Sequence, residues 1–304
     1  MKKSTFRRQV VLVVWMLLCG LSAQAADEDL ITEQITINAL EAGTLPQRIS
    51  SSKKNLITNL KIIGEINGTD LKFIHEMAGQ DINGFSTDGK LSILDLYDAK
   101  IVSGGESYNK FDNHTEDNRI GDYTFYGCSE LTSVTLPPSV TSIGHFAFCD
   151  CNNLMSVTLP SSLGGMGFSA FENCKGLTSV TLSPSLTFMD RVAFGYCSNL
   201  STLIIPSGLT SLSTLNEASI FEGSGIKSVY VAWPTPVPAG QFFYGFDVSQ
   251  STLYVPQGTR QDYWVAAVWE TLATSKSTRF QPSTSLLTIA RRRKSLATRW
   301  TANA

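Results

Sequence analysis

Apolar residues recur through the middle of the chain with a period of 23 residues, and the period holds through four units. One column is phenylalanine in every unit: Phe125, Phe148, Phe171 and Phe194. Three further columns are cysteine (Cys128, Cys151, Cys174, Cys197), leucine (Leu131, Leu154, Leu177, Leu200) and Ile120, Ile143, Met166 and Met189. Two more are Val134, Val157, Val180 and Leu203, and Leu136, Leu159, Leu182 and Ile205. A fixed period of this length is typical of stacked structural repeats.

Each unit contains the pattern L-x-x-V-x-L, which predicts a short strand. Side chains alternate between the two sides of a strand, so Val134 and Leu136 should point inward and Thr135 outward. Pro137 follows the strand and should end it, because proline cannot donate to a ladder. A single unit cannot bury its own apolar edge, so the units must stack. The pattern therefore predicts a mainly β leucine-rich-repeat solenoid, with parallel strands on one face and irregular turns on the other.

The same pattern extends beyond the regular units. Ile226, Val229 and Val231 repeat it after an insertion around residues 214–218, and Leu253 and Val255 suggest a further rung. On the amino-terminal side, 57–62 and 91–96 fit at wider spacing, and residues 70–78 between them have the spacing of a helix with Leu71, Ile74 and Ala78 on one face. We expect a small α/β cap over 26–117, repeats over 118–231, a closing segment over 232–270 near Leu253 to Trp269, and a basic tail over 271–304.

The repeat has a specific resemblance. The stretch from Ile120-Gly121 through Phe125-Tyr126-Gly127-Cys128 to Leu136-Pro137 resembles the repeat of BspA-like leucine-rich-repeat surface proteins. Residues 251–269 are similar to the closing segment of that family, and 57–62 with 67–70 resemble its leading module. The resemblance covers about residues 30–270. It implies a cell-surface or secreted protein of host-associated bacteria, in a family linked to adhesion and host-protein binding.

The first 25 residues have the features of a secretory signal. Four basic residues precede an apolar run from Val10 to Leu18, and Ala23-Gln24-Ala25 is a cleavage motif, so we expect removal after Ala25. A lipoprotein signal at Cys19 is the alternative, but Leu18 is larger than the small residue that lipid attachment requires. The apolar run is too short to span a bilayer, and no other segment is long and apolar enough. We therefore expect an exported protein without a transmembrane span.

Charge is unevenly distributed. The formal net charge is -2, but residues 1–25 carry four basic and no acidic side chains and 271–304 carry seven basic and no acidic ones, so 26–270 has a net charge of -13. An acidic body argues against nucleic-acid binding by the fold. The tail, with Arg291-Arg292-Arg293-Lys294, has three open interpretations. It is a disordered solvated segment, an attachment to an anionic surface, or a departure from its relatives through a sequence change.

No cluster of residues indicates catalysis, a metal site or a cofactor. The cysteines at one repeat position are expected to be buried free thiols, although rungs roughly 5 Å apart would permit disulfides in an exported protein. Cys149 and Cys151 lack the four ligands of a zinc site, with only His145 nearby. His75, His114 and His145 fall in a helix, a loop and a turn, and the serines recur as a column. The sequence therefore predicts a protein that is not an enzyme.

The outward positions of the strands form the candidate ligand face. Across the rungs this surface is mostly hydroxyl-lined and gains aromatic character toward Tyr230 and Trp233. The candidate residues are Thr132, Ser133, Thr135, Ser156, Thr158, Ser179, Thr181, Thr202, Ser228, Tyr230 and Trp233. Solenoids bind partners on extended surfaces, and aromatic anchors contribute much of the binding energy. The competing interpretation is that Ser and Thr are simply good strand residues facing water.

These patterns favour an exported binding module for cell-surface adhesion or for binding a host protein or glycan. The alternative function is a structural spacer in a surface assembly, with no ligand of its own.

Overall fold

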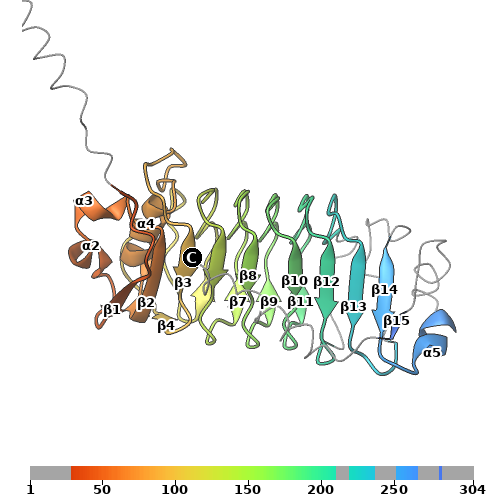
Figure 1. Ribbon diagram of the computed structural model, residues 1–304. Helices are drawn as coiled ribbons and strands as arrows, with labels where there is room; N and C mark the ends of the chain where they lie inside the picture. Colours follow the sequence, from red (N-terminus) through yellow and green to blue (C-terminus); the bar gives the residue numbers. More distant parts are fainter. Residues whose placement is uncertain (1–28, 210–218, 237–250, 266–280, 283–304) are drawn as a thin grey trace, which may run out of the picture.

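The computed structural model describes residues 29–209, 219–236, 251–265 and 281–282. Within these ranges the chain is a parallel-strand solenoid, mainly β with few helices, as the repeat predicts (Figure 1). The predicted signal peptide, the insertion at 214–218, Trp269 and most of the basic tail lie outside the described residues. No helix among the described residues is long and apolar enough to cross a bilayer.

Two parallel sheets form one side of the solenoid, which we call the front wall, and their strands stack in chain order. The first sheet contains β1 (Ile35–Ala39), β2 (Asn59–Ile66), β3 (Ile93–Asp95), β6 (Ser133–Thr135) and β8 (Ser156–Thr158), with β4 (Ala99–Ile101) also paired to β2. The second contains β10 (Ser179–Thr181), β12 (Thr202–Ile205), β13 (Ser228–Val231), β14 (Thr252–Val255) and β15 (Gln281–Pro282). In Figure 1, β8 and β10 lie side by side, but no strand pairing joins these two described strands.

The predicted strand register is confirmed. Leu60 pairs with Leu94, Leu94 with Val134, and Val134 with Val157, so the amino-terminal strands continue the same sheet as the regular repeats. At the other end, Val229 pairs with Leu253, as the spacing of the last predicted rung requires.

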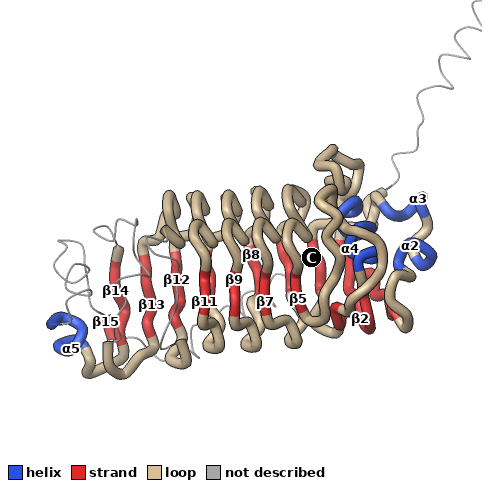
Figure 2. Tube along the Cα trace, turned by 180° about the vertical axis from the view of Figure 1, so that it is seen from behind, coloured by secondary structure: helices blue, strands red, loops and turns tan. Residues whose placement is uncertain are grey.

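A further four-stranded parallel sheet lies on the back of the solenoid (Figure 2). It consists of β5 (Arg119–Ile120), β7 (Ser142–Ile143), β9 (Gly165–Met166) and β11 (Phe188–Met189). The sequence predicted only irregular turns on this side, because a two-residue strand is too short to show alternation. The repeated Ile and Met column supplies the inward residue of each of these strands.

The phenylalanine and cysteine columns fill the interior. Phe125, Phe148, Phe171, Phe194 and Phe221 are fully buried and stack with ring centroids 4.9–5.8 Å apart. All five described cysteines are buried free thiols, as predicted. Three of them donate to a phenylalanine carbonyl of the preceding rung at 3.0–3.2 Å: Cys151 to Phe125, Cys174 to Phe148 and Cys197 to Phe171. The column thus fills space and also supplies weak donors to buried carbonyls.

The amino-terminal cap contains three helices: α2 (Leu45–Arg48), α3 (Ser51–Lys54) and α4 (Gly68–Met77). Helix α4 is the one predicted at 70–78, and Leu71, Ile74 and Ala78 are buried. Its start is fixed by a capping box, in which the Asn67 side chain accepts from Thr69 N and Asp70 accepts from Asn67 N.

At the carboxyl-terminal end, helix α5 (Arg260–Val265) follows the last regular strand. Strand β15 (Gln281–Pro282) lies within the basic tail expected over 271–304. These two residues pair with Tyr254 and Val255, on the edge that β14 would otherwise leave open.

Candidate functional site

The outward side chains of β6, β8, β10, β12, β13 and β14 form two columns, which we call the strand face. One column is Ser133, Ser156, Ser179, Thr202, Ser228 and Thr252, and the other is Thr135, Thr158, Thr181, Ile204, Tyr230 and Tyr254. Strand pairing places neighbours of each column directly opposite one another, except between the unpaired β8 and β10. Adjacent strands lie about 4.8 Å apart, so each column is a closely spaced row.

The centre of the strand face is lined by hydroxyl groups and carries no charged side chain in these two columns. Thr158 and Thr181 are exposed, while Ser133, Thr135 and Ser179 are half-buried. Ser156 and Ser133 share a hydrogen bond between their hydroxyls at 3.1 Å. Thr132 belongs less to this surface than predicted, because its hydroxyl donates to the Ser92 carbonyl at 3.0 Å.

The carboxyl-terminal end of the strand face is aromatic. Tyr230 and Tyr254 stack with ring centroids 4.2 Å apart and an interplanar angle of 8°, next to Ile204 in the same column. Tyr254 is not among the candidate residues predicted from the sequence, although its place between Leu253 and Val255 marks it as an outward residue of the last predicted rung.

Trp233 does not belong to the strand face, and this prediction is wrong. Its side chain is 1% exposed, and its indole N–H donates to the Leu209 carbonyl at 2.7 Å. The buried Tyr263 hydroxyl in turn donates to the Trp233 carbonyl at 2.9 Å. Trp233 lies two residues beyond Val231, so the alternation of β13, in which Val229 and Val231 point inward, continues to Trp233 and places it on the inward side. Its ring is part of the buried core at this end.

The amino-terminal end of the first sheet is charged. Asp95 pairs with Thr135 in the strand register, and Lys61 pairs with Asp95. The Lys61 ammonium lies 2.6 Å from Asp98 and 3.7 Å from Asp95. The hydrogen bond to Asp98 raises the pKa of Lys61, with both carboxylates contributing. The uncharged strand face therefore lies between a paired charge cluster and a tyrosine pair.

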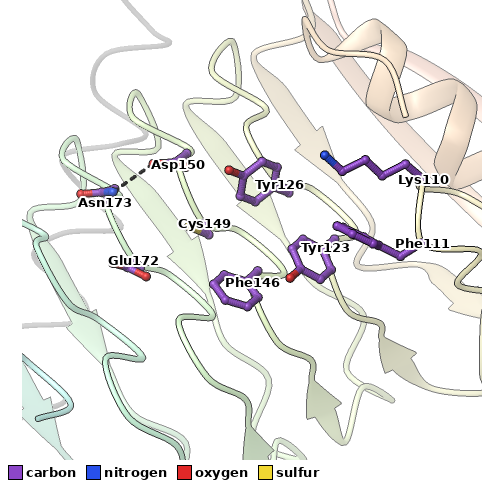
Figure 3. A pocket seen from close by; sticks show the side chains of 9 residues that line it. All are labelled: Lys110, Phe111, Tyr123, Tyr126, Phe146, Cys149, Asp150, Glu172 and Asn173. Atoms are coloured by element: carbon purple, nitrogen blue, oxygen red, sulfur yellow. Dashed lines mark hydrogen bonds between the residues drawn. The ribbon is translucent and has the colours of Figure 1, made fainter. Parts of the chain in front are cut away.

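A second feature is a pocket of about 380 Å³ in the turns that lead from the back sheet to the strands of the front wall (Figure 3). The sequence did not predict it. We call it the turn pocket. Its lining residues are Lys110, Phe111, Tyr123, Tyr126, Phe146, Cys149, Asp150, Glu172 and Asn173. Lys110 and Phe111 come from the loop before β5, and the others come from three successive rungs.

The backbone of these turns explains why a pocket forms. Two columns of residues have positive φ: Tyr123 (59°), Phe146 (54°), Ser169 and Val192 in one, and Gly127, Asp150 (61°), Asn173 and Tyr196 in the other. The turns are joined by hydrogen bonds between rungs, such as Tyr123 N to His145 O at 2.9 Å and Gly127 N to Cys149 O at 2.8 Å. Such bonds hold non-glycine residues in a conformation they rarely adopt. The column between the two, which includes Tyr126 and Cys149, lines the pocket.

Aromatic rings occupy one end of the turn pocket. Tyr123 lies between Phe111, with centroids 4.6 Å apart, and Phe146, with centroids 4.9 Å apart and an interplanar angle of 17°. Tyr126 meets Tyr123 edge-on at 5.7 Å. The Lys110 ammonium lies 5.2 Å from the centre of the Phe111 ring. Both faces of the Tyr123 ring are thus covered by neighbouring rings.

Carboxylate and amide groups occupy the other end (Figure 3). Asp150 Oδ1 accepts a hydrogen bond from Asn173 Nδ2 at 3.0 Å, and Glu172 lies one rung further along. Burial raises the pKa of Tyr126 to about 12, with the negative charge of Asp150 adding to the effect. Burial likewise raises the pKa of the Cys149 thiol, and both carboxylates contribute. Cys149 therefore stays protonated at neutral pH and is not an activated nucleophile.

No group of three or more His, Cys, Asp or Glu side chains in the described ranges is placed to hold a metal ion. The described residues thus form two distinct surfaces: an uncharged row of hydroxyls ending in stacked tyrosines, and a small pocket with an aromatic and an acidic end.

The fold and its repeating unit define a leucine-rich-repeat solenoid. Residues 118–236 match the BspA type leucine rich repeat region in six copies, so this part of the chain consists of repeats of that type. No curated protein matches the chain.

Solved structures similar to the chain are bacterial leucine-rich-repeat proteins. The leucine rich repeat protein of T. pallidum is 24% identical over 45% of this chain and 61% of its own length, with a TM-score of 0.36. The chain thus spans about three fifths of that protein. The pneumococcal vaccine antigen PcpA is 17% identical over 83% of this chain and 68% of its own, with a TM-score of 0.42. A leucine rich cell surface protein of Faecalibacterium prausnitzii is 14% identical over 83% of this chain and 79% of its own, with a TM-score of 0.24.

Proposed function

We propose that this protein is exported and acts as a non-enzymatic binding module, whose strand face contacts an extended protein or glycan at a cell surface. The observation that supports this most directly is the stacked pair Tyr230–Tyr254 at the end of an uncharged, hydroxyl-lined row. Tyrosines of this kind offer a large apolar area with a hydroxyl group and lose little conformational entropy on binding. The hydroxyl row would add directional hydrogen bonds along an elongated partner.

Two features of the sequence support the location. Residues 1–25, outside the described residues, have the pattern of a signal peptide cleaved after Ala25. Residues 118–236 match the BspA type leucine rich repeat region. The resemblance of this repeat to BspA-like surface proteins implies adhesion or host-protein binding. The ligand should be neutral or weakly charged where it meets the strand face, because the two columns of this surface lack charged side chains from Thr135 to Tyr254.

The test is binding of the chain from residue 26 onward to immobilised extracellular-matrix proteins, serum proteins and glycans at physiological salt. We expect saturable binding that the double variant Tyr230→Ser/Tyr254→Ser weakens by about tenfold or more, since buried aromatic anchors each contribute about 2 kcal/mol. Serine keeps the hydroxyl character of the row while removing the rings. The matched control is Phe85→Ser, an aromatic side chain that is 71% exposed and lies outside the strand face.

Each result has a defined meaning. Binding that both variants leave unchanged contradicts the strand-face site. Binding that disappears only at high salt points instead to the basic residues of 271–304. Absence of binding to every probe favours the alternative function of a structural spacer.

A further inference from the structure

The turn pocket is a separate feature from the strand face, because its residues come from turns and from the loop before β5, and none belongs to a front-sheet strand. Its volume of about 380 Å³ is enough for one side chain or a small ligand. The two ends of the pocket differ in character. Lys110 and the ring of Phe111 lie at one end, and Asp150, Glu172 and Asn173 lie at the other (Figure 3).

The acidic end lacks a positive partner. In the described part of the chain, neither Asp150 nor Glu172 forms an ion pair, whereas Lys61, Lys72, Lys90, Lys100 and Arg119 all do so elsewhere. Lys110, the one basic residue that lines the pocket, lies over Phe111 at the far end. Burial is the main cause of the raised pKa of the Cys149 thiol, and the negative charges of Asp150 and Glu172 raise this pKa further, which is consistent with a negative potential beside the two carboxylates. A cation entering here would gain two charge-assisted hydrogen bonds.

The ring geometry bears on what kind of ligand fits. A neutral sugar usually packs its C–H groups on an open aromatic face, but the two faces of Tyr123 are covered by Phe111 and Phe146 at 4.6 and 4.9 Å. Phe146 also contacts Phe168 in a T-shaped arrangement, with ring centroids 5.1 Å apart and an interplanar angle of 83°. The rings therefore offer an apolar wall more than a stacking platform. An aliphatic stem that ends in a flat cation matches such a wall followed by two carboxylates.

We propose that the turn pocket binds an arginine side chain from a basic segment of a partner protein. The guanidinium group is held by the carboxylates of Asp150 and Glu172, and the aliphatic stem packs along Phe146 and Tyr126. Arginine suits this site better than lysine because its fork of donors can reach two acceptors at once. Lys110 sets the direction of entry, since its charge repels the cationic group from the aromatic end.

The probe for this site is the blocked tripeptide N-acetyl-Gly-Arg-Gly-amide, followed by ligand-observed NMR with the complete chain. The comparison peptide carries citrulline, which has nearly the shape of arginine but no charge. We expect the arginine peptide to bind about tenfold more tightly than the citrulline peptide, and its affinity to fall as salt is raised.

The matched variant is Asp150→Asn/Glu172→Gln. Asparagine tolerates the positive φ of position 150 and keeps the Oδ1 that accepts from Asn173, so the turn should stay intact. We expect this variant to bind the arginine peptide about tenfold more weakly or not measurably. The control Glu33→Gln/Asp88→Asn makes the same change in net charge at exposed positions and should leave binding unchanged. Circular dichroism of each variant checks that the solenoid remains folded.

Three results overturn the proposal: equal binding of the arginine and citrulline peptides, full binding by Asp150→Asn/Glu172→Gln, or no binding of the arginine peptide at all. Binding of a neutral methyl glycoside that this variant weakens, without binding of the arginine peptide, assigns the pocket to a glycan instead. The strand-face variant Tyr230→Ser/Tyr254→Ser should bind the arginine peptide normally, so failure of the strand-face function and failure of this site are distinguishable.

Discussion

Asp70 shows how a single side chain joins separate segments of the amino-terminal cap. It is fully buried, and its carboxylate accepts from three backbone N–H groups: Gly43 at 2.5 Å, Leu45 at 2.9 Å and Asn67 at 3.0 Å. The last of these belongs to the capping box of α4, and the first two lie at the start of α2. One buried negative charge is thus satisfied by the amino-terminal ends of two helices.

Replacing this carboxylate should be costly. Asp70→Ala leaves three N–H groups without their acceptor, and hydrogen bonds to a charged group are worth about 1.5–3 kcal/mol each. We expect the free energy of unfolding to fall by about 3 kcal/mol or more, measured by urea denaturation with circular dichroism. Asp88→Ala, at an exposed position, should change it by less than about 0.5 kcal/mol. Equal stability of the two variants would show that the three bonds do not hold the cap.

His75 should make the junction between the cap and the repeats sensitive to pH. It is buried on α4, and Nε2 lies 3.0 Å from the Tyr126 carbonyl oxygen in the first turn of the repeats. Burial lowers the pKa of His75, outweighing the opposite effects of the Tyr126 carbonyl, Asp81 and Glu76. Folding therefore favours the neutral ring, and its contribution is complete above the ordinary pKa near 6.5.

As pH falls below about 6.5 toward the lower pKa of the folded state, the unfolded chain takes up a proton that the folded chain does not, and stability is lost. We expect the free energy of unfolding to drop between about pH 7 and pH 5, and to drop less in His75→Gln, which has no titrating ring. His114→Gln, at an exposed position, should retain the wild-type dependence. A His75→Gln profile parallel to that of the wild type would contradict this explanation.

At the scale of the single rung, the phenylalanine stack is the main contributor to packing. Phe171 lies between Phe148 at 4.9 Å and Phe194 at 5.2 Å, with interplanar angles of 3° and 4°. Phe171→Ala removes both contacts and leaves a cavity that the fixed rung spacing cannot close, so we expect a loss of about 3–5 kcal/mol in the free energy of unfolding. Phe85→Ala, 71% exposed, should be nearly neutral in the same measurement.

The front strands and the core could be predicted from the sequence because the same residue type recurs at each inward position. For this reason Leu94 and Val134 pair in the first sheet, and Val229 and Leu253 pair in the second. The back sheet could not be predicted, since strands such as Ser142–Ile143 have only one inward residue and no alternation. The inward direction of Trp233, by contrast, could have been predicted, because Trp233 continues the alternation in which Val229 and Val231 point inward and Tyr230 outward.

The turn pocket was missed for a different reason: its residues are those that vary between rungs. The residue equivalent to Tyr126 is Cys149 in the next rung and Glu172 in the rung after that. The position of Tyr123 changes in the same way to Phe146 and then Ser169. Periodicity detects what is constant, namely the core, and gives no signal where the surface differs. The sequence feature that could have indicated this site is a repeat position whose residue type changes from rung to rung.

At the scale of the whole molecule, the solenoid should behave as a series of units that contact only their neighbours. Removing residues 175–197, one period of 23, joins Cys174 to Ser198 and places Leu200 where Leu177 stood. Every apolar column then resumes in phase, so we expect a folded protein by circular dichroism. Less surface is buried, and the denaturant m-value should fall by roughly a tenth. The turn pocket and the pair Tyr230–Tyr254 are both retained.

Removing only residues 175–185 is the decisive comparison, because it deletes fewer residues but puts the columns out of phase. Strand β12 would then have to stack on a rung whose Leu and Phe positions no longer match its own, exposing apolar side chains that are now buried. We expect this shorter deletion to be unfolded or aggregated while the longer one folds, measured by circular dichroism and size-exclusion chromatography. If the longer deletion failed equally, rungs would not be interchangeable units, and stability would depend on contacts that extend beyond neighbouring rungs. If both folded, the 23-residue period would not be what sets the register of the stack.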